Sequence, residues 1–151
     1  MRTAPSRDRH GRGLRGPLFP HAVPRARSPR EKFDALVLEA YAPIHHAFAE
    51  QLHGLDIAVD TIPRMRLSAD MTVLPDEIFA DGPVPLGRVI PAGVDVRGRP
   101  TRARIVIFRR PIEQRSRDAL ERRDLLATVL SALVAVYLNV DPRDIDPRFE
   151  Y

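Results

Sequence analysis

The first hydrophobic pattern along the chain is a stripe of apolar residues at helical spacing. They recur every three or four positions across residues 33–52, which is the spacing of one face of an α-helix. Ser28 and Glu31 precede this stripe at the spacing of a capping box, which predicts a helix start. Pro43 interrupts the stripe, so we expect a kink or a break there. Gly54 is expected to end the helix.

The middle of the chain has the alternation typical of strands. Residues 55–62, LDIAVDTI, alternate between apolar and polar side chains, which predicts a half-buried strand. Residues 102–109, RARIVIFR, contain four consecutive apolar residues, which indicates a strand buried on both faces and central in its sheet. Three weaker expectations complete this region: a strand at residues 86–90, a polar connection at 93–100, and a proline-rich segment at 63–85 with a helical turn near 76–80.

A second long helix is predicted for residues 116–138. Its second half, LLATVLSALVAVYL at residues 125–138, contains no charge. Fourteen helical residues span about 21 Å, less than the ~30 Å hydrocarbon core of a bilayer, so we expect a core helix and no membrane segment. Asn139 is the expected left-handed cap, and Asp141 and Asp144 fall at the start of a short closing helix. Together these elements predict an α+β fold, with a few-stranded mixed sheet packed on two main helices.

Composition separates the N-terminus from the rest of the chain. Residues 1–30 contain eight arginines and one acidic residue, whereas the remainder contains 16 basic and 19 acidic residues. The N-terminal stretch has almost no apolar run, so it cannot bury enough surface to offset the entropy of ordering. We therefore interpret residues 1–28 as an extended, disordered arm and residues 29–151 as a domain.

The arm and the absence of cysteine bear on location and partners. The arm lacks the apolar region of a secretory signal, and a chain without cysteine suits a reducing cytoplasm, so we expect a cytoplasmic protein. The arm is either a solvated tail or a segment that contacts nucleic acid or an acidic partner through counterion release. Phe19 is the one aromatic residue among its arginines, which gives base stacking little support.

Four segments of the chain together match the pattern of one known family, although none of them is diagnostic alone. They are RDRHGRGLRGPLFP, EKFDALVLEA, RIVIFRRPIE and NVDPRDIDP. In this order they resemble the small bacterial zincin-like metallopeptidase family, also called minimal zincins. The resemblance covers most of the chain. It implies a zincin-like α+β fold and a zinc site on the last long helix.

The family carries H-E-x-x-H-x-x-G on that helix. Two histidines one turn apart bind zinc, and the glutamate activates the attacking water. Matching the NVDPRDIDP ending puts the family glycine at Asn139, and the two histidines and the glutamate then fall on Ala132, Val136 and Leu133. None of these three side chains binds a metal or moves a proton.

The resemblance therefore implies a pseudoenzyme with a degenerate active site, without zinc and without proteolysis. Asp141 and Asp144 remain as acids nearby, but capping explains them as well as a ligand role does. The surviving function would be the binding of a peptide or protein. We expect the binding surface along residues 104–108, by strand addition as in active zincins, or in the groove beside the final helix.

Two alternatives remain open. His46, Glu50 and His53 stand at i, i+4 and i+7, so on a continuous helix they share one face and form a relocated metal site of an active metallopeptidase. A solvated polar face explains the same spacing. In the other alternative, the arginine-rich arm makes the chain a binder of nucleic acid or of an acidic partner.

Overall fold

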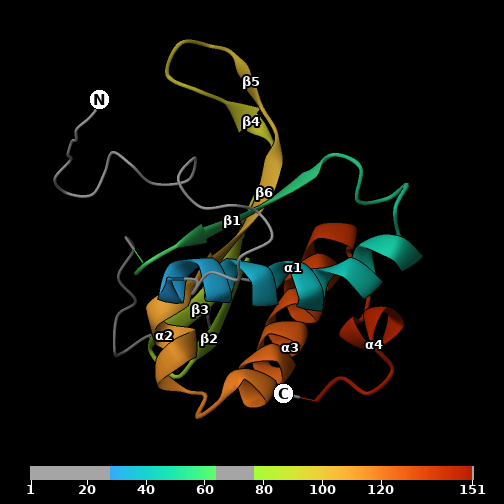
Figure 1. Ribbon diagram of the computed structural model, residues 1–151. Coiled ribbons are helices and arrows are strands. Elements are labelled where there is room, and N and C mark those ends of the chain that lie inside the picture. The colour runs from blue at the N-terminus through green and yellow to red at the C-terminus, as the bar shows by residue number, and fades with distance from the viewer. Residues whose placement is uncertain (1–27, 64–76, 151) are drawn as a thin grey trace, which may run out of the picture.

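The structure is a computed structural model and describes residues 28–63 and 77–150. Its elements, in chain order, are α1 (Pro29–Ala47), β1 (Leu55–Asp60), β2 (Ile78–Asp81), β3 (Val84–Ile90), β4 (Gly93–Val94), β5 (Pro100–Thr101), β6 (Ala103–Phe108), α2 (Arg109–Gln114), α3 (Ala119–Leu138) and α4 (Pro142–Ile145). A four-stranded mixed sheet lies beside the helices, and β4 and β5 form a separate hairpin that stands away from it (Figure 1). The predicted α+β fold class is confirmed.

Strand β6 lies inside the sheet, whose order is β1-β6-β3-β2. It pairs in parallel with β1, with Leu55 opposite Ala103, and antiparallel with β3, with Gly87 opposite Ile107. The predicted central position is therefore confirmed. Both sides of β6 already hold strand partners, so the expected strand addition of a peptide along residues 104–108 is wrong.

One face of the sheet packs against α1 and α3. Alternate strand residues meet the apolar stripe of α1 and the uncharged half of α3 in a single core. Its fully buried side chains exclude water from the space between helices and sheet, which is the main source of stabilisation in such a layer. The largest of them are Phe33, Val37, Leu52, Leu86, Ile105, Ile107, Ile112, Leu126, Val129, Leu130 and Leu133.

Helix α1 begins as predicted but ends earlier. The Ser28 hydroxyl accepts from the Glu31 backbone N–H at 3.1 Å, and the Glu31 carboxylate accepts from the Ser28 N–H at 3.0 Å. The helix continues through Pro43 and ends at Ala47, so Gly54 is not its stop. The turns after Ala47 bury Leu52 in the core and lead the chain directly into β1.

Helix α3 is the predicted core helix, with its start three residues later than expected. The Asp118 carboxylate caps it by accepting from the Glu121 N–H at 2.8 Å. Asn139 ends it with a φ of 58°, the expected left-handed conformation. Asp141 accepts from the Arg143 N–H at 2.8 Å and starts α4, also as predicted. Within the part of the chain that the structure describes, no helix is long and apolar enough to cross a bilayer.

Three expectations for the middle of the chain change. The helical turn near residues 76–80 is wrong where it is described, because residues 78–81 form the edge strand β2. The polar connection at 93–100 contains the β4–β5 hairpin, whose turn uses Gly98 at a φ of 78°. The short helix α2, which follows β6 at once, was not predicted.

Candidate functional site

The three positions that match the family motif lie on two sides of α3. Leu133 faces the sheet and packs against Gly87 of β3, since a Cβ added to that glycine would lie 2.8 Å from the Leu133 Cδ1. Ala132 and Val136 are one turn apart and share another side of the helix. Ala132 is buried, whereas Val136 is 39% exposed. The position matched to the catalytic glutamate is thus a core position.

Val136 lines a groove beside the C-terminal part of α3. The groove has a volume of about 670 Å³ and lies where β1 and β6 begin and β3 ends. In Figure 1 the base of the β4–β5 hairpin lies close to this end of α3. Most of the lining is apolar, and its residues come from five different segments of the chain. The lining residues are Gly54, Glu77, Val89, Pro91, Ala92, Thr101, Arg102, Ala103, Val136 and Tyr137.

Arg102 and Thr101 of the groove have hydrogen-bond partners among neighbouring residues that do not line it. The Arg102 Nε donates to both carboxylate oxygens of Asp56, at 3.1 and 3.2 Å, and its Nη2 donates to the His53 carbonyl at 2.9 Å. The Thr101 hydroxyl accepts from the Gly93 N–H at 3.2 Å. These partners leave the apolar surface around Val136 as the part of the groove that is open to an occupant.

Two tyrosines interact on neighbouring helices: Tyr137 of α3, which lines the groove, and Tyr41 of α1. The Tyr137 hydroxyl lies against Gly54, 3.7 Å from where a Cβ of that glycine would stand. Tyr41 of α1 is buried in the core, and its hydroxyl has no hydrogen-bond partner. Burial raises the pKa of Tyr41 above its ordinary value, and the neighbouring Tyr137 raises it further. The Tyr41 hydroxyl therefore stays protonated and neutral at physiological pH.

The described lining of the groove contains few ionisable side chains. This described lining contains one carboxylate, that of Glu77, and no histidine, cysteine or serine. Glu77 lies 3.9 Å from the Arg88 guanidinium, measured from Oε1 to Nη2. One carboxylate without a nitrogen or sulfur ligand does not form the three-ligand centre of a catalytic zinc. The groove instead offers a surface for an apolar side chain.

The alternative metal site at His46, Glu50 and His53 required a continuous helix through all three residues, and the structure does not have one. Helix α1 ends at Ala47, so only His46 is helical, and the other two residues lie in the turns that follow. All three side chains are exposed. No group of three or more metal-binding side chains occurs among residues 28–63 and 77–150.

The remaining predicted residues have structural explanations or fall outside the structure. Asp141 serves as the cap of α4, and Asp144 is exposed in the first turn of that helix. The arginine-rich arm, residues 1–28, lies outside the described residues except for Ser28. The proposed contact of the arm with nucleic acid therefore stays a prediction.

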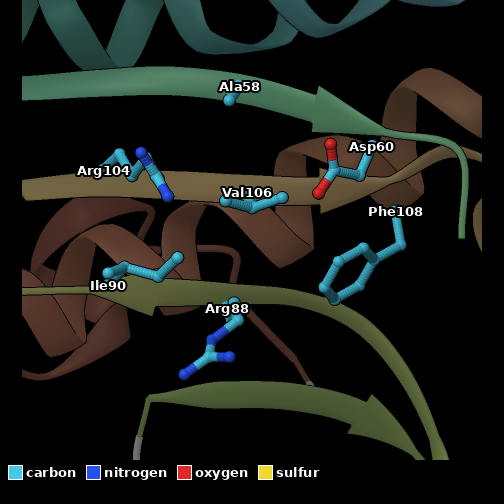
Figure 2. A pocket seen from close by; sticks show the side chains of 7 residues that line it. All are labelled: Ala58, Asp60, Arg88, Ile90, Arg104, Val106 and Phe108. Atoms are coloured by element: carbon cyan, nitrogen blue, oxygen red, sulfur yellow. The ribbon is translucent and has the colours of Figure 1, made fainter. Parts of the chain in front are cut away.

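A second hollow, which the sequence did not predict, lies on the face of the sheet opposite α1 and α3. It is lined by side chains of β1, β3 and β6, including Arg88, Arg104 and Asp60 (Figure 2). Strand alternation places Arg104 on one face together with Val106, which was the available signal. The pairing of β3 with β6 was not predictable from that alternation, and it is this pairing that brings Arg88 beside Arg104.

Comparison with known proteins adds no relative. No protein-family model and no curated protein sequence matches this chain. The zincin-like resemblance therefore rests on the four sequence segments alone and stays a prediction. Function has to be inferred from the groove beside α3 and from the chemistry of its lining.

Proposed function

We propose that this chain is a zincin-like protein without a catalytic centre, and that it binds an extended peptide in the groove beside α3. The observation that carries the proposal is the exposed Val136 in the groove. By the sequence resemblance, this valine stands where the family has its second zinc-binding histidine. A valine cannot hold a cation, but it contributes to a pocket for an apolar side chain.

The hairpin beside the groove supports an extended peptide as the occupant. In the described part of the chain β4 pairs only with β5, so its outer edge offers backbone groups without a strand partner. Pro100 removes a backbone N–H from β5, which makes β4 the better edge for an added strand. Pro91 and Ala92 connect β3 to β4 and also line the groove. A peptide paired with β4 would therefore direct alternate side chains toward Val136.

The hairpin turn is held in a defined shape, which favours this mode of binding. The Asp95 carboxylate accepts from the backbone N–H groups of Arg97 and Arg99, at 2.8 and 2.9 Å. The Asp95 carbonyl also accepts from the Gly98 N–H at 2.9 Å. A pre-ordered edge costs less conformational entropy when a peptide adds to it. Val94, which is largely exposed on β4, extends the apolar surface beyond the groove.

A peptide library with a matched pair of valine variants tests the proposal. The probe is a fluorescent pool of extended peptides with leucine at the centre and random flanking residues without proline, and binding is followed by anisotropy. Val136→Asp should weaken binding at least about tenfold, because it places a charge in the apolar groove. Val140→Asp is the control, since Val140 is similarly exposed on α3's C-terminal side but does not line the groove.

Two results would contradict the proposal. In the first, no peptide of the pool binds, or Val136→Asp binds as tightly as the unmodified chain. In the second, elemental analysis of the purified protein finds zinc at close to one ion per chain, which would mean that a metal centre exists despite the substituted motif. A peptide-cleavage assay run beside the binding assay separates binding from residual hydrolysis.

A further inference from the structure

The face of the sheet opposite α1 and α3 carries a hollow with a volume of about 540 Å³. Side chains at alternate positions of β1, β6 and β3 project into it (Figure 2). Its middle level holds Ala58 and Val106 together with Arg88, whereas Arg104 and Asp60 lie at its two ends. The lining residues are Ala58, Asp60, Arg88, Ile90, Arg104, Val106 and Phe108.

The charged groups of this hollow are poorly matched by protein partners. Arg104 and Asp60 make no hydrogen bond or ion pair in the part of the chain that the structure describes. The Arg88 guanidinium has one ion pair, at the long distance of 3.9 Å from Glu77, and its buried Nε has no hydrogen-bond partner. Arg102, at the end of the same sheet, has three short hydrogen bonds instead.

An unpartnered buried donor costs free energy, and an acceptor from a ligand removes that cost. The guanidinium is planar, permanently charged and suited to carboxylate oxygens. Arg104 at one end of the hollow and Arg88 at its middle level therefore present donors for an anion.

The register of the strands lets both arginines reach one anionic group. Arg88 pairs with Val106 and Ile90 pairs with Arg104, so the two arginines are diagonal neighbours on β3 and β6. Diagonal neighbours in an antiparallel pair are about 7–8 Å apart, within reach of two long side chains. In Figure 2 both arginine side chains lie on the same face of the sheet, and the guanidinium of Arg88 is directed toward β2.

Asp60 places an opposite charge at the far end of the hollow. It pairs with Phe108, two positions beyond Val106 along β6 and four beyond Arg104. At about 3.4 Å per residue, its backbone is roughly 14 Å from that of Arg104, and the side chains that project between them shorten the gap. Val106 and Phe108 form the apolar floor between the two charged ends (Figure 2).

We propose that this hollow binds a small zwitterion whose carboxylate and ammonium groups are separated by a short apolar chain. The carboxylate accepts from Arg88 and Arg104, the chain lies over Val106, and the ammonium group donates to Asp60. This site is separate from the groove beside α3, and its occupation does not depend on peptide binding there.

The test compares 6-aminohexanoate, hexanoate, hexylamine and inorganic phosphate by calorimetry on the full chain. The zwitterion should bind most tightly, because it alone satisfies both charged ends. Arg104→Gln should weaken its binding about 10- to 100-fold, which corresponds to one charge-assisted hydrogen bond. Asp60→Asn should make 6-aminohexanoate bind no better than hexanoate. Arg97→Gln in the hairpin turn should change nothing, because this arginine lies outside the hollow.

Three outcomes would overturn the proposal. The first is that 6-aminohexanoate shows no binding at millimolar concentration. The second is that it binds equally well to Arg104→Gln and to the unmodified chain. The third is that phosphate binds through Arg104 while the zwitterion has no advantage over it, which would make this a simple anion site. Arg88→Gln provides a second variant for each comparison, and urea unfolding of every variant confirms that the fold is kept.

Discussion

Strand β6 directs side chains to both faces of the sheet, and the surroundings of these side chains differ between the two faces. Toward α1 and α3 it directs Ala103, Ile105 and Ile107, all of them in the continuous core. Toward the opposite face it directs Arg104, and with it the apolar floor of the arginine-lined hollow. Packing determines the inner face, where each side chain has neighbours on every side. The outer face instead keeps charged side chains that have few close partners among the described residues.

Besides the Oδ1 of Asp34 on α1, each face contains one buried polar side-chain atom without a hydrogen-bond partner among the described residues. On the inner side it is the Tyr41 hydroxyl, which lies in the core and is closed to any ligand. On the outer side it is the Arg88 Nε, which lines an open hollow. The first therefore lowers stability without a compensating interaction. The second is available to a ligand, so its cost is recoverable on binding.

The largest expected effect is on the inner face, at Leu133. Leu133→Ala should lower the free energy of unfolding by about 2–5 kcal/mol, because it opens a cavity between α3 and β3 where the side chain is fully buried. Urea unfolding measures the change. Val136→Ala, three residues later on the same helix but partly exposed, is the control and should cost much less. Equal losses for the two variants would contradict the assignment of Leu133 to the core.

The next largest effect is expected at Gly87, because the Leu133 side chain of α3 packs directly against β3 there. A Cβ at this position would meet the Leu133 Cδ1 at 2.8 Å and the Val106 carbonyl oxygen at 3.1 Å. The backbone oxygen cannot move aside easily, so Gly87→Ala should cost about 1–3 kcal/mol in unfolding measurements. The double variant with Leu133→Ala should lose less than the sum of the two single losses. Strict additivity would mean that the two residues are not in contact.

Local signals in the sequence were sufficient for several element boundaries. The capping box at Ser28 and Glu31 and the left-handed Asn139 depend on hydrogen bonds and backbone angles within a few residues, and the structure has all of them. The four consecutive apolar residues of β6 correctly indicated a strand covered on both faces. In each case the cause lies within a few residues of the element itself.

The remaining features depend on contacts that are distant in sequence. The early end of α1 follows from the burial of Leu52 before β1, whereas Gly54 looked like a local stop signal. The hollow on the outer face depends on the register between β3 and β6, which no local pattern specifies. The sequence placed Val136 at a motif position, but its exposure in a groove depends on how α3 lies on the sheet.

A substitution at Tyr41 tests whether its buried hydroxyl lacks a hydrogen-bond partner. Tyr41→Phe should raise the free energy of unfolding by about 1 kcal/mol at neutral pH, since it removes a buried hydroxyl without a partner. The raised pKa of Tyr41 also predicts a pH dependence. Above about pH 10 the unfolded tyrosine loses its proton while the folded one keeps it, so the contribution of this group is complete below that pH and declines above it.

The pH dependence is read from urea unfolding on either side of that pH. The decline should be smaller in Tyr41→Phe than in the unmodified chain. A loss of stability in Tyr41→Phe at neutral pH would mean that the hydroxyl has a partner after all.

The smallest expected effect on stability is at Arg104, on the outer face. Arg104→Gln should change the free energy of unfolding by less than about 0.5 kcal/mol, because the side chain is exposed and makes no ion pair in the described part of the chain. The same substitution should nevertheless abolish most binding of the zwitterion. On the outer face a residue is thus expected to affect binding and not stability, whereas on the inner face residues affect stability. If urea unfolding showed a loss above about 1 kcal/mol, Arg104 would be a structural residue and the contrast between the two faces would fail.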